Sequence, residues 1–205
     1  MKRIILTIEK DSEALRKVSQ PVKIIDFEVE KLVVDLIDTL LVQDDPPGLG
    51  LSAPQIGVLK RVFVARLVSD KSERARVKLG QKGQDSSSKN KSLQEDKKNI
   101  KAFINPEITK FSNETADFLE GCLSVPNFYG HVIRPAKITL KAKDRSGKNF
   151  KRSFQGLLSR IIQHEIDHLN GALFIDHVHH QKGKLYKFMG KDNKGEEKFA
   201  EVVIE

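Results

Sequence analysis

The stretch "QGLLSRIIQHEIDHLNG", residues 155–171, predicts the central helix of the fold. Leucine and isoleucine recur along it at steps of three and four residues, the spacing of one buried helix face. Asn170 and Gly171 follow, a pair typical of a helix end. His164 and His168 are four residues apart and therefore share a face. We expect this helix to pack inside the domain and to bring two imidazoles together.

His164, Glu165 and His168 form the pattern H-E-x-x-H, two possible metal ligands and a possible general base. Glu165 is about 100° round the helix from His164, where it can reach a metal-bound water without binding the metal. The alternative is two helix histidines that bond only to neighbouring residues. A catalytic site needs a third ligand, for which Cys122, other histidines and carboxylates are candidates. Cys122 could instead be a small buried hydrophobe, and Asp167 could support a ligand or simply be solvated.

Outward from this helix, the pattern predicts an α+β domain. Asp26 is a plausible N-cap for a helix that should end before Pro46. Further elements are a glycine-rich loop at 48–57, a strand at 58–68, a strand from 101 to Pro106, and a hairpin at 136–154 with its turn at 144–147. Strands and helices do not alternate regularly, which argues against a doubly wound sheet. We expect mixed or antiparallel sheets around the central helix, in a single domain.

Composition places the chain among soluble proteins, with 205 residues, 39% hydrophobic and 31% charged residues, and one cysteine. No run approaches the roughly 20 apolar residues of a membrane span, and the N-terminus does not resemble a signal peptide. We expect a cytoplasmic protein. The net charge of +8 indicates either a lysine-rich surface or an anionic partner such as RNA.

Two segments differ in character from the rest. Residues 69–99 are almost all polar and are predicted to be a mobile insertion. Residues 177–205 form a polar tail with a loose histidine cluster, expected to be exposed, and a possible strand at "FAEVVIE". The catalytic domain should therefore span 1–176.

Three segments in this order resemble the three motifs of peptide deformylases: "GLGLSAPQIG" (48–57), "EGCLS" (120–124) and "QHEIDH" (163–168). Weaker likeness covers most of residues 4–176. The resemblance implies a metallohydrolase that removes the N-formyl group from the initiator methionine of new polypeptides and releases formate. It implies one divalent metal ion, Fe²⁺ in the cell with Zn²⁺, Ni²⁺ or Co²⁺ as substitutes. It assigns Cys122, His164 and His168 as ligands and Glu165 as the base.

The same resemblance implies further roles. The side-chain amide of Gln55 and the backbone N–H of Leu123 would stabilise the oxyanion, and Arg134 would support Glu120. Helix spacing adds Leu157, Arg160 and Ile161 to the face of His164. The substrate residues expected are Gly48, Leu49, Gly50, Glu120, Gly121, Leu157, Arg160 and Ile161. We expect the aliphatic part of the Arg160 side chain to lie at the rim of the pocket and its guanidinium to reach solvent. There it would influence the preference for the substrate residues that follow methionine.

Two alternatives remain at this stage: a metallopeptidase with the same helix, and a non-catalytic binding protein. The common H-E-x-x-H peptidases take a downstream His or Glu as third ligand, so a Cys ligand would argue against the first. The expected partners are N-formylmethionyl nascent peptides and, transiently, the ribosome. Neither a membrane nor a sequence-specific nucleic acid is expected, and a monomer is favoured.

Overall fold

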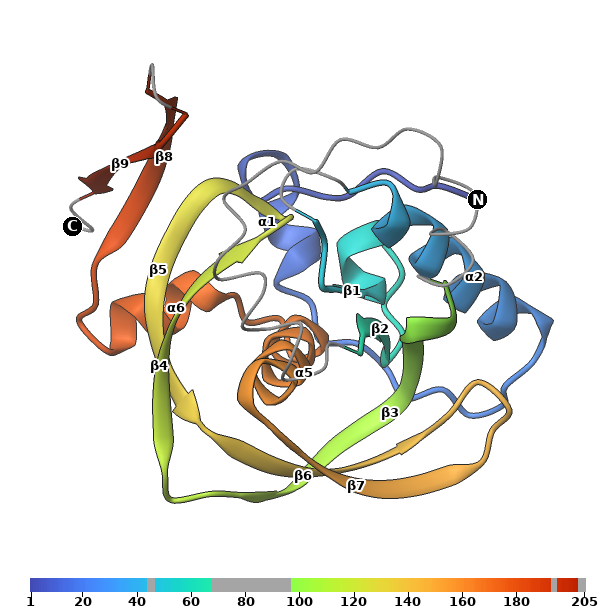
Figure 1. Cartoon of the computed structure of the whole chain (residues 1–205). Coiled ribbons are helices and arrows are strands. Elements are labelled where there is room, and N and C mark those ends of the chain that lie inside the picture. The colour runs from blue at the N-terminus through green and yellow to red at the C-terminus, as the bar shows by residue number, and fades with distance from the viewer. Residues whose placement is uncertain (44–46, 68–96, 193–194, 203–205) are drawn as a thin grey trace.

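A computed structural model describes residues 1–43, 47–67, 97–192 and 195–202 (Figure 1). The insertion predicted at 69–99 lies outside the described residues except for its last three. The helices are α1 (Ile8–Leu15), α2 (Phe27–Leu41), the 3-10 helix η1 (Ala53–Ile56), α5 (Gly156–Leu169) and α6 (Phe174–His180). The strands are β1 (Gly50–Ser52), β2 (Val62–Arg66), β3 (Ile100–Phe111), β4 (Thr115–Cys122), β5 (Val125–Pro135), β6 (Lys137–Lys143), β7 (Asn149–Gln155), β8 (Leu185–Lys191) and β9 (Glu197–Val202).

Two antiparallel sheets surround α5 (Figure 1). The first has the strand order β1-β2-β3-β6-β7, and the second has the order β4-β5-β8-β9. The long strands β4 and β5 curve past one side of α5, while α2 lies beyond β1 and β2 on the other side. The α+β prediction with a central helix is confirmed. None of the described helices is long and apolar enough to cross a membrane.

The two helices that the sequence predicts, α2 and α5, form where the pattern places them, whereas α1 and α6 were not predicted. The Asp26 side chain accepts a hydrogen bond from the backbone N–H of Val29 at 3.0 Å, which caps α2 as expected. The apolar face of α2 packs on β1 and β2. α5 buries Ile161, Ile162 and Leu169 against the first sheet, while α6 packs on the second. The predicted hairpin is confirmed as β6 and β7, and the expected strand at 58–68 is the shorter β2.

β3 runs further than the sequence predicts, because it passes through Pro106 to Phe111. Proline lacks an N–H and usually ends a central strand. Here the ladder shifts register between Ile104 and Glu107, and this irregularity accommodates the proline. Asn105 has a positive φ of 50°, and its side chain bonds both the N–H and the carbonyl of Val22 at 2.8 Å.

The second sheet is the part of the fold that the pattern did not predict. β4 and β5 carry glycines and prolines, which weaken the alternation of a strand. β8 pairs with β5 and β9 pairs with β8, so residues 185–191 and 197–202 of the polar tail continue this sheet. β9 confirms the possible strand at "FAEVVIE" as far as Val202, and residues 203–205 lie outside the described part of the chain.

Candidate metal centre and active site

The three predicted metal ligands come from two elements. His164 and His168 are one turn apart on α5, and Cys122 is the last residue of β4. One ligand atom of each residue lies within 4.8 Å of the ligand atoms of the other two. The sulfur of Cys122 is 3.2 Å from Nε2 of His168. The helix and the strand end therefore bring one sulfur and two imidazoles together.

This donor set fits one divalent metal ion. Thiolate and imidazole ligands suit iron, zinc, nickel and cobalt. Burial acts against ionisation of Cys122, but His168 and His164 outweigh it and hold the pKa of the thiol well below its usual value. A thiolate is the form of cysteine that binds metals. Three protein ligands also match the number in catalytic sites, which keep one position open.

Glu165 lies beside the three ligands and is only 3% exposed. Burial raises the pKa of its carboxyl to about 7, although His164 and His168 act in the opposite direction. Its Oε2 is buried without a hydrogen-bond partner among the residues described. A Cβ atom at Gly50 would overlap this carboxyl, so only glycine leaves it room. The site thus holds a carboxylate with a free acceptor atom and a pKa suited to proton transfer near neutral pH.

The side chain of Gln55 has a fixed orientation. Its Oε1 accepts the backbone N–H of Ser52 at 2.9 Å and the hydroxyl of Ser52 at 2.8 Å. Its Nε2 consequently points the other way, to the hydroxyl of Ser124 at 3.1 Å and the sulfur of Cys122 at 3.6 Å. The amide therefore presents its N–H groups toward the metal ligands, and Leu123 follows Cys122 at the same cavity.

Glu120 connects His164 to two buried arginines. Its Oε2 is 2.9 Å from Nδ1 of His164, which fixes the orientation of that imidazole. Arg134 donates to both oxygens of Glu120, at 2.7 and 3.0 Å, and Arg160 donates to Oε1 at 2.8 Å. Burial alone would raise the pKa of Glu120, but the bonds from His164 and Arg134 lower it far below its usual value. The carboxylate is therefore held charged inside the protein.

The expectation that the Arg160 guanidinium reaches solvent is wrong. Arg160 is 5% exposed, and its guanidinium also donates to the backbone carbonyls of Val132, at 2.7 Å, and Ala116. It lies 5.2 Å from the ring centre of Phe118. Helix spacing places Arg160 beside the cavity, but the partners that bury its charge come from β4 and β5, which the sequence pattern did not reveal.

Asp167 belongs to the same network rather than to solvent. Its Oδ2 accepts from Arg134 at 2.5 Å and lies 2.9 Å from Nε2 of His177. Asp167 therefore ties the arginine that holds Glu120 to α6. His177 is about one-third exposed, while the other two histidines of the tail cluster, His179 and His180, are exposed.

One cavity of about 460 Å³ collects the predicted substrate residues. Gly48, Leu49, Gly50, Glu120, Gly121, Leu157, Arg160 and Ile161 all line it, together with Gln55, Cys122, Leu123, His164 and Glu165. Arg134 and His168 lie behind its wall, at 4% and 1% exposure. Further residues that line the cavity were not predicted from the sequence, among them Leu119, Phe128 and Tyr129. Recognition of "EGCLS" as the end of a hairpin strand would have found them.

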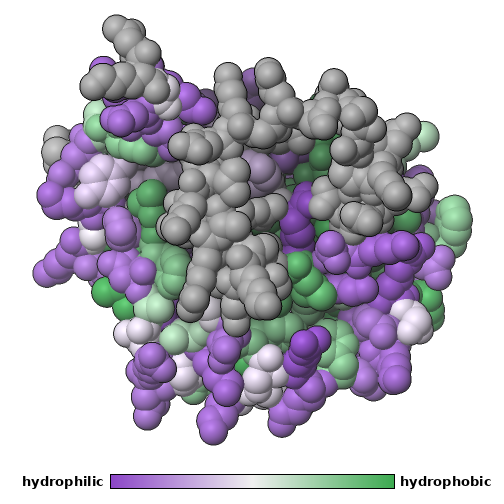
Figure 2. Space-filling view, viewed as in Figure 1, coloured by the Kyte–Doolittle hydropathy of each residue, from purple (hydrophilic) through white to green (hydrophobic). Residues whose placement is uncertain are grey.

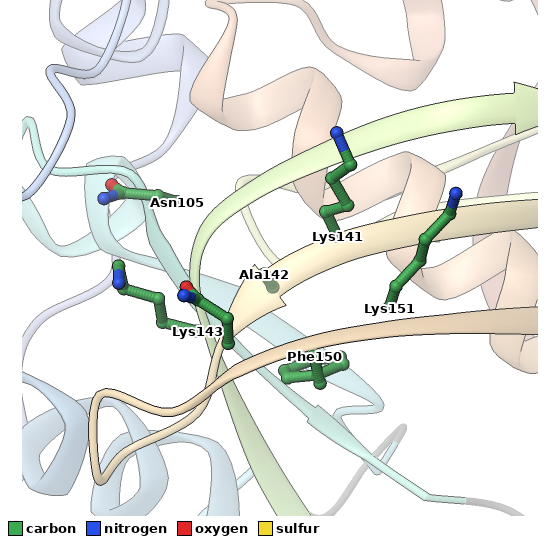
Figure 3. A pocket seen from close by; sticks show the side chains of 7 residues that line it. Asn105, Lys141, Ala142, Lys143, Phe150 and Lys151 are labelled. Carbon is green, nitrogen blue, oxygen red and sulfur yellow. The ribbon is translucent and has the colours of Figure 1, made fainter.

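A second cavity, of about 360 Å³, lies at β6 and β7 near Asn105 (Figure 3). Lys141, Lys143 and Lys151 line it with Phe150. The residues that line it include neither a carboxylate nor a thiol nor an imidazole. It is therefore a poorer candidate for a catalytic site than the larger cavity.

Comparisons with known proteins identify the family of this chain. Residues 2–184 match the family model of polypeptide deformylases. The chain is 37% identical to a peptide deformylase of Pseudomonas aeruginosa over 85% of this chain and 87% of that one. It is 40% identical to that of Cellvibrio japonicus, over 83% of this chain and 84% of that one.

Solved structures show the same likeness. A peptide deformylase from Legionella pneumophila matches with a TM-score of 0.67 and 38% identity, over 86% of each chain. One from Synechococcus elongatus, solved in complex with actinonin, matches with a TM-score of 0.65 and 29% identity, over 84% of this chain and 76% of that one. This chain belongs to the polypeptide deformylase family and is an enzyme that removes the N-formyl group from newly synthesised polypeptides.

Proposed function

We propose that formyl removal takes place at Cys122, His164 and His168, with Glu165 as the general base and acid. The observation that carries this proposal is the convergence of three ligand atoms within 4.8 Å beside a buried carboxyl whose pKa is about 7. When bound, a divalent metal ion supplies a water of lowered pKa and polarises the formyl carbonyl. We propose Fe²⁺ as the ion in the cell, with Zn²⁺, Ni²⁺ or Co²⁺ as substitutes that the same N and S donors accept.

Glu165 would move the proton. Hydrolysis adds hydroxide to the formyl carbon and breaks its bond to nitrogen, so the amine must gain the proton that the water loses. Glu165 can take that proton on Oε2, which has no other partner among the described residues, and deliver it to the leaving nitrogen. A pKa near 7 suits both transfers, because the group gains and loses a proton readily at neutral pH.

Gln55 and Leu123 would stabilise the negative charge that develops on the formyl oxygen. The Gln55 amide is held with its nitrogen toward the metal ligands before any substrate arrives. Donors that are already oriented need no rearrangement during the reaction, which is why such groups accelerate it strongly. Leu123 would add its backbone N–H from the turn after Cys122. Glu120 and Arg134 would keep His164 in its ligating orientation.

The methionine side chain would lie along α5, against Leu157 and Ile161. An unbranched thioether fits such an apolar wall well. Gly48, Gly50 and Gly121 would line the path of the peptide backbone, and the absence of Cβ atoms at these positions leaves room for Leu40, Glu165 and Tyr129. Because the Arg160 guanidinium is bonded inside the protein, we propose that only its stem contributes to this pocket.

The remaining roles follow from the substrate. We propose a cytoplasmic monomer that contacts the ribosome transiently, since newly synthesised chains emerge there. The net charge of +8 supports attraction to ribosomal RNA by summed charge rather than by sequence-specific recognition.

Formate release from formyl-Met-Ala-Ser tests the proposal. Protein purified without oxygen should release formate, and a Glu165→Gln variant with the same metal content should be nearly inactive. Internal peptide bonds of a longer peptide should stay intact, which separates a deformylase from a metallopeptidase. Failure of metal-loaded parent protein to release formate would overturn the proposal and favour a binding protein.

A further inference from the structure

The outer side of the second sheet carries a cluster of aromatic and aliphatic side chains, which we name the aromatic face. It consists of Leu119 on β4, Tyr129 and His131 on β5, Tyr186 and Phe188 on β8, and Phe199 on β9. The strand register pairs Leu119 with His131, Tyr129 with Tyr186, and Phe188 with Phe199, so all six side chains project from the same side.

The rings of the aromatic face touch one another across three strands. The ring centres of Tyr129 and Phe199 are 5.4 Å apart, and those of Phe188 and Phe199 are 5.7 Å apart. Those of His131 and Tyr186 are 6.5 Å apart. These contacts form two groups of rings, and the two groups are neighbours because Tyr129 lies opposite Tyr186 in the strand register. In Figure 2, green and pale residues lie among purple ones on the side where these strands run.

This surface is open rather than part of the core. Phe199 is 40% exposed and Leu119 is 49% exposed. The core contacts of the sheet are made by its other side, where Val132 and Leu185 pack against α6. Two acidic side chains on this side of the sheet are paired, Asp117 with His131 at 3.0 Å and Glu201 with Lys184 at 2.8 Å. The aromatic face therefore suits an apolar partner better than a charged one.

The aromatic face is continuous with the catalytic cavity. Leu119 and Tyr129 belong to both, because they line the cavity and also stand on the outer side of the sheet. The ring of Tyr129 lies directly over Gly121, where a Cβ atom would come within 2.7 Å of it. β4 is the edge strand of the sheet, so the cavity can open around this edge onto the aromatic face.

We propose that the aromatic face binds the segment of the substrate polypeptide that follows its first few residues, with a preference for apolar and aromatic side chains. This inference rests on the proposed function, because the occupant is the chain whose formylated end lies in the cavity. Crossing from β4 to β9 takes three strand spacings, about 14 Å, or roughly four extended residues. Non-directional apolar contact suits substrates that share only their first residue.

The experiment compares three substrates with the full-length, metal-loaded protein. They are formyl-Met-Ala-Ser, a ten-residue formyl-Met peptide with Leu and Phe at positions five to eight, and the same peptide with Ser and Gly there. The tripeptide is too short to reach Phe199 and serves as the internal reference. The apolar ten-residue peptide should have the highest kcat/KM, about fivefold above its polar counterpart, as expected for one or two aromatic contacts.

Phe199→Ala should remove most of this advantage, and Tyr186→Ala should reduce it. Phe111→Ala is the matched control, since Phe111 is 52% exposed on β3, in the other sheet. Phe199→Leu keeps an apolar side chain and should retain about half of the advantage of the apolar peptide. This variant distinguishes loss of the aromatic ring from unfolding of β9. Equal kcat/KM ratios in parent and Phe199→Ala would overturn the inference.

A binding measurement separates failure of this inference from failure of the proposed function. Fluorescence anisotropy of a labelled, unformylated apolar ten-residue peptide needs no catalysis. The parent should bind it about fivefold more tightly than Phe199→Ala. If no peptide released formate, the proposed function would fail while this result would still decide the aromatic face. Sedimentation showing a dimer that Phe199→Ala abolishes, with unchanged peptide affinity, would assign the face to a second copy and overturn the inference.

Discussion

Replacing Arg160 by methionine tests whether this arginine holds the site together or contacts substrate. The change removes a guanidinium that is 5% exposed and keeps an apolar stem of similar length. Three acceptors lose a donor: Glu120, Val132 and Ala116. Glu120 keeps its bonds to Arg134 and His164, so its charge remains compensated.

The expected cost is a loss of about 3 kcal/mol in the free energy of unfolding. Losing a hydrogen bond to a charged group costs about 2 kcal/mol, and each carbonyl left without its donor adds about 1 kcal/mol. Better packing of the methionine and the remaining partners of Glu120 offset about 1 kcal/mol. For a domain of this size the unfolding temperature should fall by about 9 °C.

Circular dichroism of parent and variant, followed with temperature and with urea at equal metal content, measures this loss. Arg152→Met is the matched control, because Arg152 is exposed on β7 and stacks 5.7 Å from the ring of Phe154. The control should change stability by less than about 0.5 kcal/mol. The loss of stability in Arg160→Lys should lie between those of the two methionine variants, because one ammonium group cannot make all the hydrogen bonds of a planar guanidinium. An Arg160→Met protein as stable as the parent, with altered KM values among formyl-Met peptides, would refute the reasoning.

Three further predictions concern catalysis by the same site. Gly50→Ala should lower kcat about 100-fold while the protein stays folded, because the new Cβ displaces the Glu165 carboxyl; normal kcat would contradict this. Burial raises the pKa of Glu165 to about 7, and a base acts when deprotonated, so kcat/KM should rise about tenfold per pH unit below 7 and level off above it. A profile without this rise would count against Glu165 as the base. Ser52→Ala should lower kcat about fivefold with KM unchanged, because Gln55 loses one of two donors to Oε1; a change in KM alone would point to substrate binding instead.

The local parts of the site could be predicted from the sequence. Helix periodicity alone places His164, His168 and Ile161 on one face of α5, and Glu165 next to them. These positions depend on the rise and turn of a single helix, which the apolar pattern of 155–171 specifies. The N-cap of α2 at Asp26 and the β6–β7 hairpin are confirmed for the same reason, since each is determined by neighbouring residues.

The surroundings of Arg160 could not be predicted in that way. Its acceptors are Glu120, 40 positions earlier, and two carbonyls on different strands. Their approach depends on how β4 and β5 pair and curve past α5. The glycines and prolines of these strands hide their pattern, so the sequence offered no reason to expect a buried guanidinium.

The proposed metal centre depends on a match between the residue spacing of a strand and that of a helix. Glu120 and Cys122 are two residues apart on β4, so both point to the same side of the strand, about 7 Å apart along it. His164 and His168 are four residues apart on α5, about 6 Å along the helix axis. The distance between Glu120 and Cys122 along the strand is therefore nearly equal to that between His164 and His168 along the facing helix. This match lets Cys122 approach His168 while Glu120 reaches His164. The interval in "EGC" is therefore as much a part of the site as that in "HEIDH", because inserting one residue between Glu120 and Cys122 would turn one of them away from α5.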